Sequence, residues 1–90
     1  MTASEHVDAA WQLGHELMQP MPPGWYRSAF EVAGVRGWLV SAIEREQYNA
    51  LPWPKRMDYE AKAEALTLTE AHRLCREQAW AKHRKNEEGR

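Results

Sequence analysis

Two proline clusters divide this chain into three parts, because proline lacks a backbone N–H and ends helices and central strands. The first cluster lies in the stretch QPMPPG, residues 19–24, and the second in PWP, residues 52–54. We therefore expect three segments of regular structure joined by two stiff connectors. At 90 residues, these segments form a single domain, residues 1–90, near the small end of folds that are stable alone.

The segment before the first proline cluster has the pattern of an amphipathic helix. Thr2 and Glu5 have the spacing of a capping box at its start. The apolar residues that recur at helical spacing are Val7, Ala10, Trp11, Gly14, Leu17 and Met18. We predict a helix over residues 4–18 that ends before Pro20.

The middle segment favours a β-hairpin over residues 25–41. WYRSAFEV, residues 25–32, is rich in aromatic and β-branched residues that alternate with polar ones. Ala33–Gly34 is the expected turn, and VRGWLVS, residues 35–41, is the returning strand. A short helix over 42–51 should follow, with a capping box formed by Ser41 and Glu44.

A single long helix over residues 35–51 is the alternative for the second half of this segment. Val35, Leu39, Ala42 and Ile43 also fit a period of 3.6 residues. The adjacent Trp38, Leu39 and Val40 favour the strand instead.

The last segment begins with the most ambiguous stretch, MDYEAKAEAL, residues 57–66. Its apolar residues alternate as in a strand, yet Glu, Ala and Lys are strong helix formers. We leave open whether a third strand near 59–66 or a helix forms here. Thr67 and Glu70 have the spacing of another capping box, which predicts a final helix over 69–85 followed by a frayed tail.

Together these elements predict an α+β domain, in which helices pack on one face of a small antiparallel sheet. Its core must be thin, so stability is expected to depend in part on self-association or on a partner. Three tryptophans are assigned to this core: Trp11, Trp25 and Trp38.

Composition narrows the function classes. The formal net charge is −1, so bulk charge does not indicate nucleic acid or membrane as a partner. Residues 72–85 nevertheless carry a local +4, which leaves −5 for the rest. A single cysteine, Cys75, forms no intrachain disulfide, and the chain shows no membrane span and no signal peptide, so we expect a cytoplasmic protein.

Catalytic and metal chemistry have weak support. His72 and Cys75 lie one helical turn apart, but a zinc site needs three or four ligands. We interpret them as a partly exposed histidine beside a small core cysteine. No nucleophile has a neighbouring base in a known pattern, and no glycine-rich phosphate loop is present, so we expect no enzyme activity, no cofactor and no metal.

The strongest candidate for a binding site is Trp80, which lies on the charged face of the final helix. Arg73, Arg76 and Arg84 surround it at helical spacing. One interpretation is local, with an arginine stacked on the indole or the ring tucked beneath the N-terminal helix. The other is a partner-binding centre, because Trp and Arg are enriched at such positions.

A second candidate is Trp53, which lies between two prolines and is followed by Lys55 and Arg56. A rigid loop loses little entropy on binding, so this position suits a partner contact. Alternatively, Trp53 closes the end of the core as a lid.

We therefore expect a non-enzymatic protein-binding module that occludes or bridges a partner with an acidic surface. Small phage- or mobile-element-encoded inhibitors, anti-CRISPR proteins among them, share this size and this lack of motifs.

One alternative is nucleic-acid binding by the basic final helix. With a third strand, the element order is similar to that of double-stranded-RNA-binding domains, although their lysine-rich last-helix start is here TLTEAH. The other alternative is a structural homodimer subunit.

Overall fold

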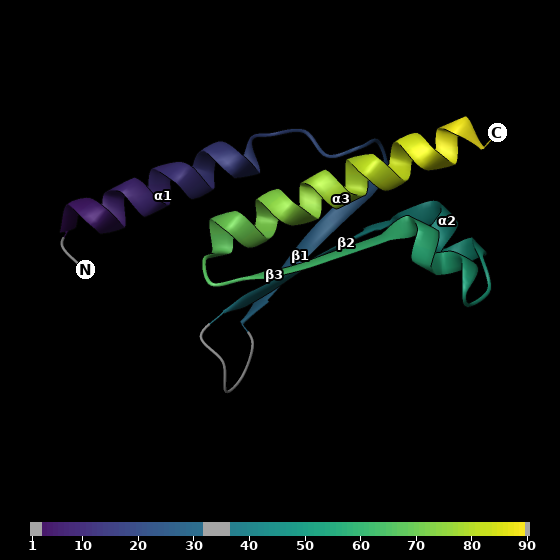
Figure 1. Ribbon diagram of the computed structural model, residues 1–90, viewed down its shortest axis with the longest axis horizontal. Coiled ribbons are helices and arrows are strands. Elements are labelled where there is room, and N and C mark those ends of the chain that lie inside the picture. The colour runs from purple at the N-terminus through teal and green to yellow at the C-terminus, as the bar shows by residue number, and fades with distance from the viewer. Residues whose placement is uncertain (1–2, 32–36, 90) are drawn as a thin grey trace.

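The computed structural model describes residues 3–31 and 37–89, with side chains described from residue 9 onward. It shows three antiparallel strands in the order β1-β2-β3, with the longer helices on one side of this sheet (Figure 1). The predicted α+β class is confirmed. The elements are α1 (Ala3–Leu17), β1 (Trp25–Glu31), β2 (Trp38–Glu44), α2 (Arg45–Ala50), the 3-10 helix η1 (Lys55–Tyr59), β3 (Glu60–Ala65) and α3 (Leu68–Glu88).

The core lies between α3 and the sheet and, apart from Trp25, is built from small side chains, so the assignment of Trp25 to the core is confirmed. Val40 pairs with Ala63 and Ala42 with Ala61, so these four residues share one face of the sheet and are buried there. The facing residues of α3 recur every fourth position and are Ala71, Cys75 and Ala79. Small residues on both sides allow a close approach, and the prediction of Cys75 as a small core residue is confirmed.

Within the ambiguous stretch 57–66, residues 60–65 form a strand, β3, because its alternating alanines face α3, while residues 57–59 belong to η1. Period-2 burial thus overrides the helix propensity of Glu, Ala and Lys. The alternative of one helix over 35–51 is wrong, since β2 is the central strand and pairs on both sides. The cap of the last helix is confirmed, because Thr67 Oγ1 accepts a hydrogen bond from Glu70 N at 3.2 Å.

All three predicted helices differ from the prediction at their boundaries, α1 by one residue at each end, and the second strand, β2, ends at Glu44 rather than at residue 41. The short helix begins at Arg45 rather than at residue 42, because Ala42 is needed in the core face of β2. Glu44 caps this helix in place of Ser41, accepting from Gln47 N at 2.8 Å. Helix α3 continues to Glu88, beyond the predicted end at 85. The predicted Thr2 cap and the Ala33–Gly34 turn lie outside the described residues.

The connector between α1 and β1 is held against the C-terminal end of β2. Arg45 N donates to Gly24 O at 3.1 Å, and Gly24 has φ of 84°. A side chain at this position would be strained, and its Cβ would lie 2.6 Å from Glu44 Oε1. The glycine therefore lets the chain turn from the proline-rich connector into β1.

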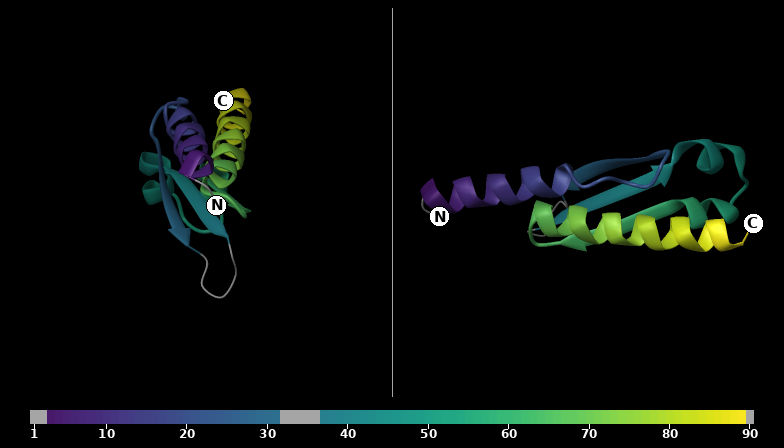
Figure 2. Two further views of the ribbon diagram at one scale, coloured as in Figure 1. Left: turned by 90° about the vertical axis from the view of Figure 1, so that its left-hand side faces the viewer. Right: turned by 90° about the horizontal axis from the view of Figure 1, so that it is seen from above.

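Helix α1 overlaps the rest of the molecule only near its C-terminal end, and its N-terminal part projects beyond the sheet and α3 (Figure 2). The principal-axis extents are 49 × 28 × 16 Å, and the radius of gyration is 14.6 Å. A compact chain of this length has a radius of about 12 Å. The molecule is therefore a thin, two-layer body with a helical arm.

Candidate protein-interaction surface

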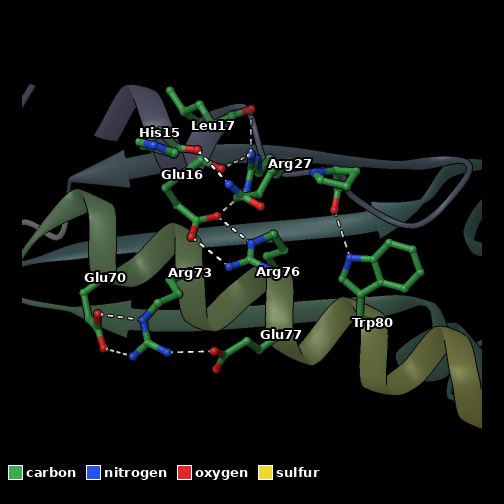
Figure 3. A network of polar contacts seen from close by, with 11 residues as sticks. His15, Glu16, Leu17, Arg27, Glu70, Arg73, Arg76, Glu77 and Trp80 are labelled. Carbon is green, nitrogen blue, oxygen red and sulfur yellow. Dashed lines mark hydrogen bonds and ion pairs between the residues drawn. The ribbon is translucent and has the colours of Figure 1, made fainter. Parts of the chain in front are cut away.

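Two of the predicted binding arginines are engaged within the chain (Figure 3). Arg76 Nε and Nη2 donate to the two carboxylate oxygens of Glu16 at 2.7 and 3.0 Å. Arg73 contacts both Glu70 and Glu77, with Nη1 2.7 Å from Glu77 Oε1. Acidic residues on α1 and α3 thus match much of the local positive charge that the sequence places on the last helix.

Trp80 is half-buried and packs on the connector that follows α1 (Figure 3). Its Nε1 donates to Pro20 O at 2.9 Å, and its ring meets His83 edge to face at a centroid distance of 5.7 Å. The indole therefore joins α3 to the connector, which explains why a large apolar side chain lies on a charged helix face. A partner-binding role for Trp80 stays a prediction.

The remaining predicted residues lie on separate elements. Arg84 is exposed on α3, whereas Trp53 and Lys55 are exposed near η1. Arg56 Nε donates to Leu51 O at 2.6 Å, and its guanidinium lies 5.5 Å from the ring centre of Tyr48. Trp53 is 69% exposed, so it does not close the core as a lid.

A buried polar cluster joins α1 to the body. Glu16 is 7% exposed, and Arg27 of β1 approaches its carboxylate at 3.7 Å, in addition to Arg76. Burial alone would raise the pKa of Glu16, but the Arg76 hydrogen bond and the charges of Arg76 and Arg27 lower it overall. The attraction from the two arginines therefore outweighs the desolvation of the carboxylate.

His72 belongs to the same region and is buried, so the prediction of a partly exposed histidine is wrong. Burial, and then the charge of Arg27, lower the pKa of His72, although Glu16 opposes this. Burial also raises the pKa of the Cys75 thiol to about 11, which makes this cysteine a poor nucleophile.

Helix α1 carries an exposed apolar face that the sequence reading did not identify. Trp11 is 72% exposed and Met18 84% exposed, so the assignment of Trp11 to the core is wrong. Glu16 faces the body, and Trp11 lies about 140° around the helix from it. Helical periodicity alone gives no signal for this face, because it does not show which side of α1 meets the body.

This exposed face of α1 contains an apolar surface hollow of about 510 Å³. We call it the α1 hollow; it is lined by Ala10, Trp11, Gly14, His15 and Met18. Gly14 forms its floor between Trp11 and Met18, which lie at helical spacing on either side. The lining contains no Asp, Glu, Lys or Arg.

Gly14 has no structural requirement within the described chain. A Cβ built at Gly14 meets nothing within 4 Å, and the positive φ found at Gly24 does not occur here. A glycine inside a helix costs about 0.5–1 kcal/mol relative to alanine. The small residue therefore leaves space at the surface at the expense of helix stability.

The face of the sheet opposite α3 is a second exposed surface. Tyr26 and Phe30 of β1 point to this side and are both exposed. The Arg45 guanidinium lies 4.3 Å from the ring centre of Tyr26 and covers part of it. This surface mixes aromatic and charged groups, unlike the α1 hollow.

Within the described residues, no three His, Cys, Asp or Glu side chains gather as metal ligands, and no helix has the length and apolar character to cross a bilayer. Comparison with protein-family models finds no matching family, and comparisons with curated proteins and with solved structures find no similar protein.

Proposed function

We propose that this chain is a non-enzymatic protein-binding module whose binding surface is the apolar face of α1. The observation that carries this proposal is the exposure of Trp11 and Met18 around a hollow on a projecting helix. Large apolar groups that are clustered rather than scattered mark interaction sites. Tryptophan is also among the residues that contribute most to binding energy at interfaces.

The arginines of α3 give less support to a nucleic-acid partner. Arg73 and Arg76 already hold carboxylates, and the start of α3 presents Glu70 where a phosphate-binding helix would present basic groups. Occlusion or bridging of a protein partner needs no catalytic group and no excess of positive charge. An inhibitor of the phage or mobile-element type is one role that such a module would fill.

Two exposed tryptophans provide a matched test. Trp11 and Trp53 have nearly equal exposure, 72% and 69%, but only Trp11 borders the α1 hollow. Immobilised wild type, Trp11→Ala and Trp53→Ala are used to capture partners from an extract of bacterial cells that also produce the untagged chain, so that a second copy is among the possible partners, with identification by mass spectrometry. We expect Trp11→Ala to lose the captured partner and Trp53→Ala to keep it. The reverse pattern would move the binding surface to the loop before η1, and unchanged capture by both would contradict the proposal.

A further inference from the structure

We infer that the partner of the α1 hollow is a second copy of this chain, bound through an antiparallel pair of α1 helices. This inference rests on the proposed function and names its partner. Trp11 projects from α1, and the hollow over Gly14 lies three residues further along the same face. In a two-fold antiparallel pair, Trp11 of each copy enters the hollow of the other, so both contacts form at once.

A parallel pair would not achieve this match, because it would set each Trp11 against its own symmetry mate. The offset between Trp11 and Gly14 is about 4.5 Å along the helix axis, which an antiparallel pair centred between residues 12 and 13 compensates. The projection of α1 beyond the body also separates the two bodies in such a pair (Figure 2).

The exposed area of the chain leaves room for a further interface. Its accessible surface is 6477 Å², whereas a folded monomer of 10.5 kDa exposes about 5,400 Å². The difference of about 1,100 Å² reflects the elongated shape of the chain, in which α1 projects from the body (Figure 2). The chain thus leaves more surface uncovered than a compact monomer does, and the exposed face of α1 is part of that surface.

The core of the single chain is also small. Val40 and Cys75 are the largest fully buried side chains besides Pro22, and five of the eight buried core residues are alanines. Trp25 is the one large side chain of that core cluster. Small domains commonly gain stability by oligomerisation. A second copy is the partner that is always present at the concentration of the chain itself.

The chemistry of the lining favours a second copy over a charged partner. None of the lining residues is Asp, Glu, Lys or Arg, so an acidic partner surface would find no counter-charge in the hollow. The formal net charge of −1 creates little repulsion between two copies. A second copy supplies both an apolar knob and an apolar hollow at the matching spacing.

The test is sedimentation velocity of the purified full chain over a dilution series that reaches about 100 μM, above the micromolar range of weak standard-size interfaces. The variants are Gly14→Leu, Trp11→Ala and Trp53→Ala. We expect the wild type and Trp53→Ala to sediment as dimers. Gly14→Leu should raise the dissociation constant of the dimer. Each of the two symmetric contacts should contribute at least about tenfold, which gives about 100-fold in all.

Gly14→Leu separates specific docking from general stickiness. Leucine is a better helix former than glycine and adds exposed apolar surface, so it preserves α1 and would strengthen nonspecific association. Weaker association by Gly14→Leu therefore supports insertion into the hollow, and unchanged or stronger association overturns it. A monomeric wild type at the highest concentration would also overturn the second copy as partner, while Trp11-dependent capture of another protein would leave the proposed function standing.

Discussion

Replacement of Glu16 by glutamine tests whether the buried polar cluster holds α1 to the body. Glu16→Gln keeps the size of the side chain and removes its charge. The variant leaves Arg76 and Arg27 facing a neutral amide inside the contact between α1, β1 and α3. We expect a substantial loss of stability, because an unpaired buried charge costs more than a lost hydrogen bond.

The size of the loss follows from how deeply each partner is buried. Breaking a fully buried ion pair by removing one member costs about 3–5 kcal/mol. Glu16 is 7% exposed, but the Arg76 side chain keeps 23% of its surface exposed, so water can partly solvate it. We therefore expect about 3 kcal/mol, at the lower end of that range, which for a domain of this length lowers Tm by about 15 °C.

The assay is thermal and urea unfolding followed by circular dichroism, with Glu77→Gln as the matched control. Glu77 also pairs with an arginine at 2.7 Å, but it lies exposed on one face of α3. Its loss should cost about 0.5 kcal/mol or less. Adding Arg76→Met to Glu16→Gln should restore part of the stability, since it removes one of the unpaired charges. If Glu16→Gln costs no more than Glu77→Gln, the cluster does not anchor α1 and this reasoning is refuted.

Three further predictions concern Trp80, His72 and Glu16. Trp80→Phe removes the hydrogen bond to Pro20 O and should cost about 1 kcal/mol in urea unfolding; a loss below about 0.3 kcal/mol would mean that the bond does not stabilise the connector. Burial and Arg27 lower the pKa of His72 below its ordinary 6.5, so its contribution to stability is complete above 6.5 and is lost as pH falls toward the lowered value. The unfolding free energy should therefore decline as pH falls through about 6.5 in the wild type, and less in His72→Gln; equal slopes would contradict the assignment. Glu16, with a pKa lowered from 4.5, adds a second loss as pH falls below that value.

Much of the fold could be predicted because its signals are local. The alternation in WYRSAFEV and the Thr67 cap predicted β1 and the start of α3 without tertiary information. The start of α2 could not be predicted in this way. Ser41 and Glu44 have the spacing of a capping box, but both residues lie in strand β2. Pairing of β2 with both neighbours decided that boundary, and such pairing depends on residues distant in sequence.

The exposed face of α1 was not predicted, and this error has one physical cause. Helical periodicity identifies the apolar and polar faces of a helix, but it does not show which face meets the body. For α1 the expected packing is inverted: among residues 9–17, Glu16 is the buried residue, while Trp11 is exposed. The arginines of α3 and β1 determine this orientation, since they bind the polar face of α1 and turn its apolar face outward.

This inversion is itself an argument for a partner. An isolated chain would gain more by burying Trp11 and Met18 than by burying one carboxylate with its arginines, because buried ion pairs rarely exceed the stability of apolar packing. An orientation that forgoes apolar burial within the chain is favourable when the same surface is buried elsewhere. The Glu16 cluster and the α1 hollow are thus two sides of one arrangement, in which the polar side fixes the helix and the apolar side is presented for binding. On this reasoning, Glu16→Gln should weaken self-association as well as folding, because a helix that no longer docks in one orientation presents no defined hollow.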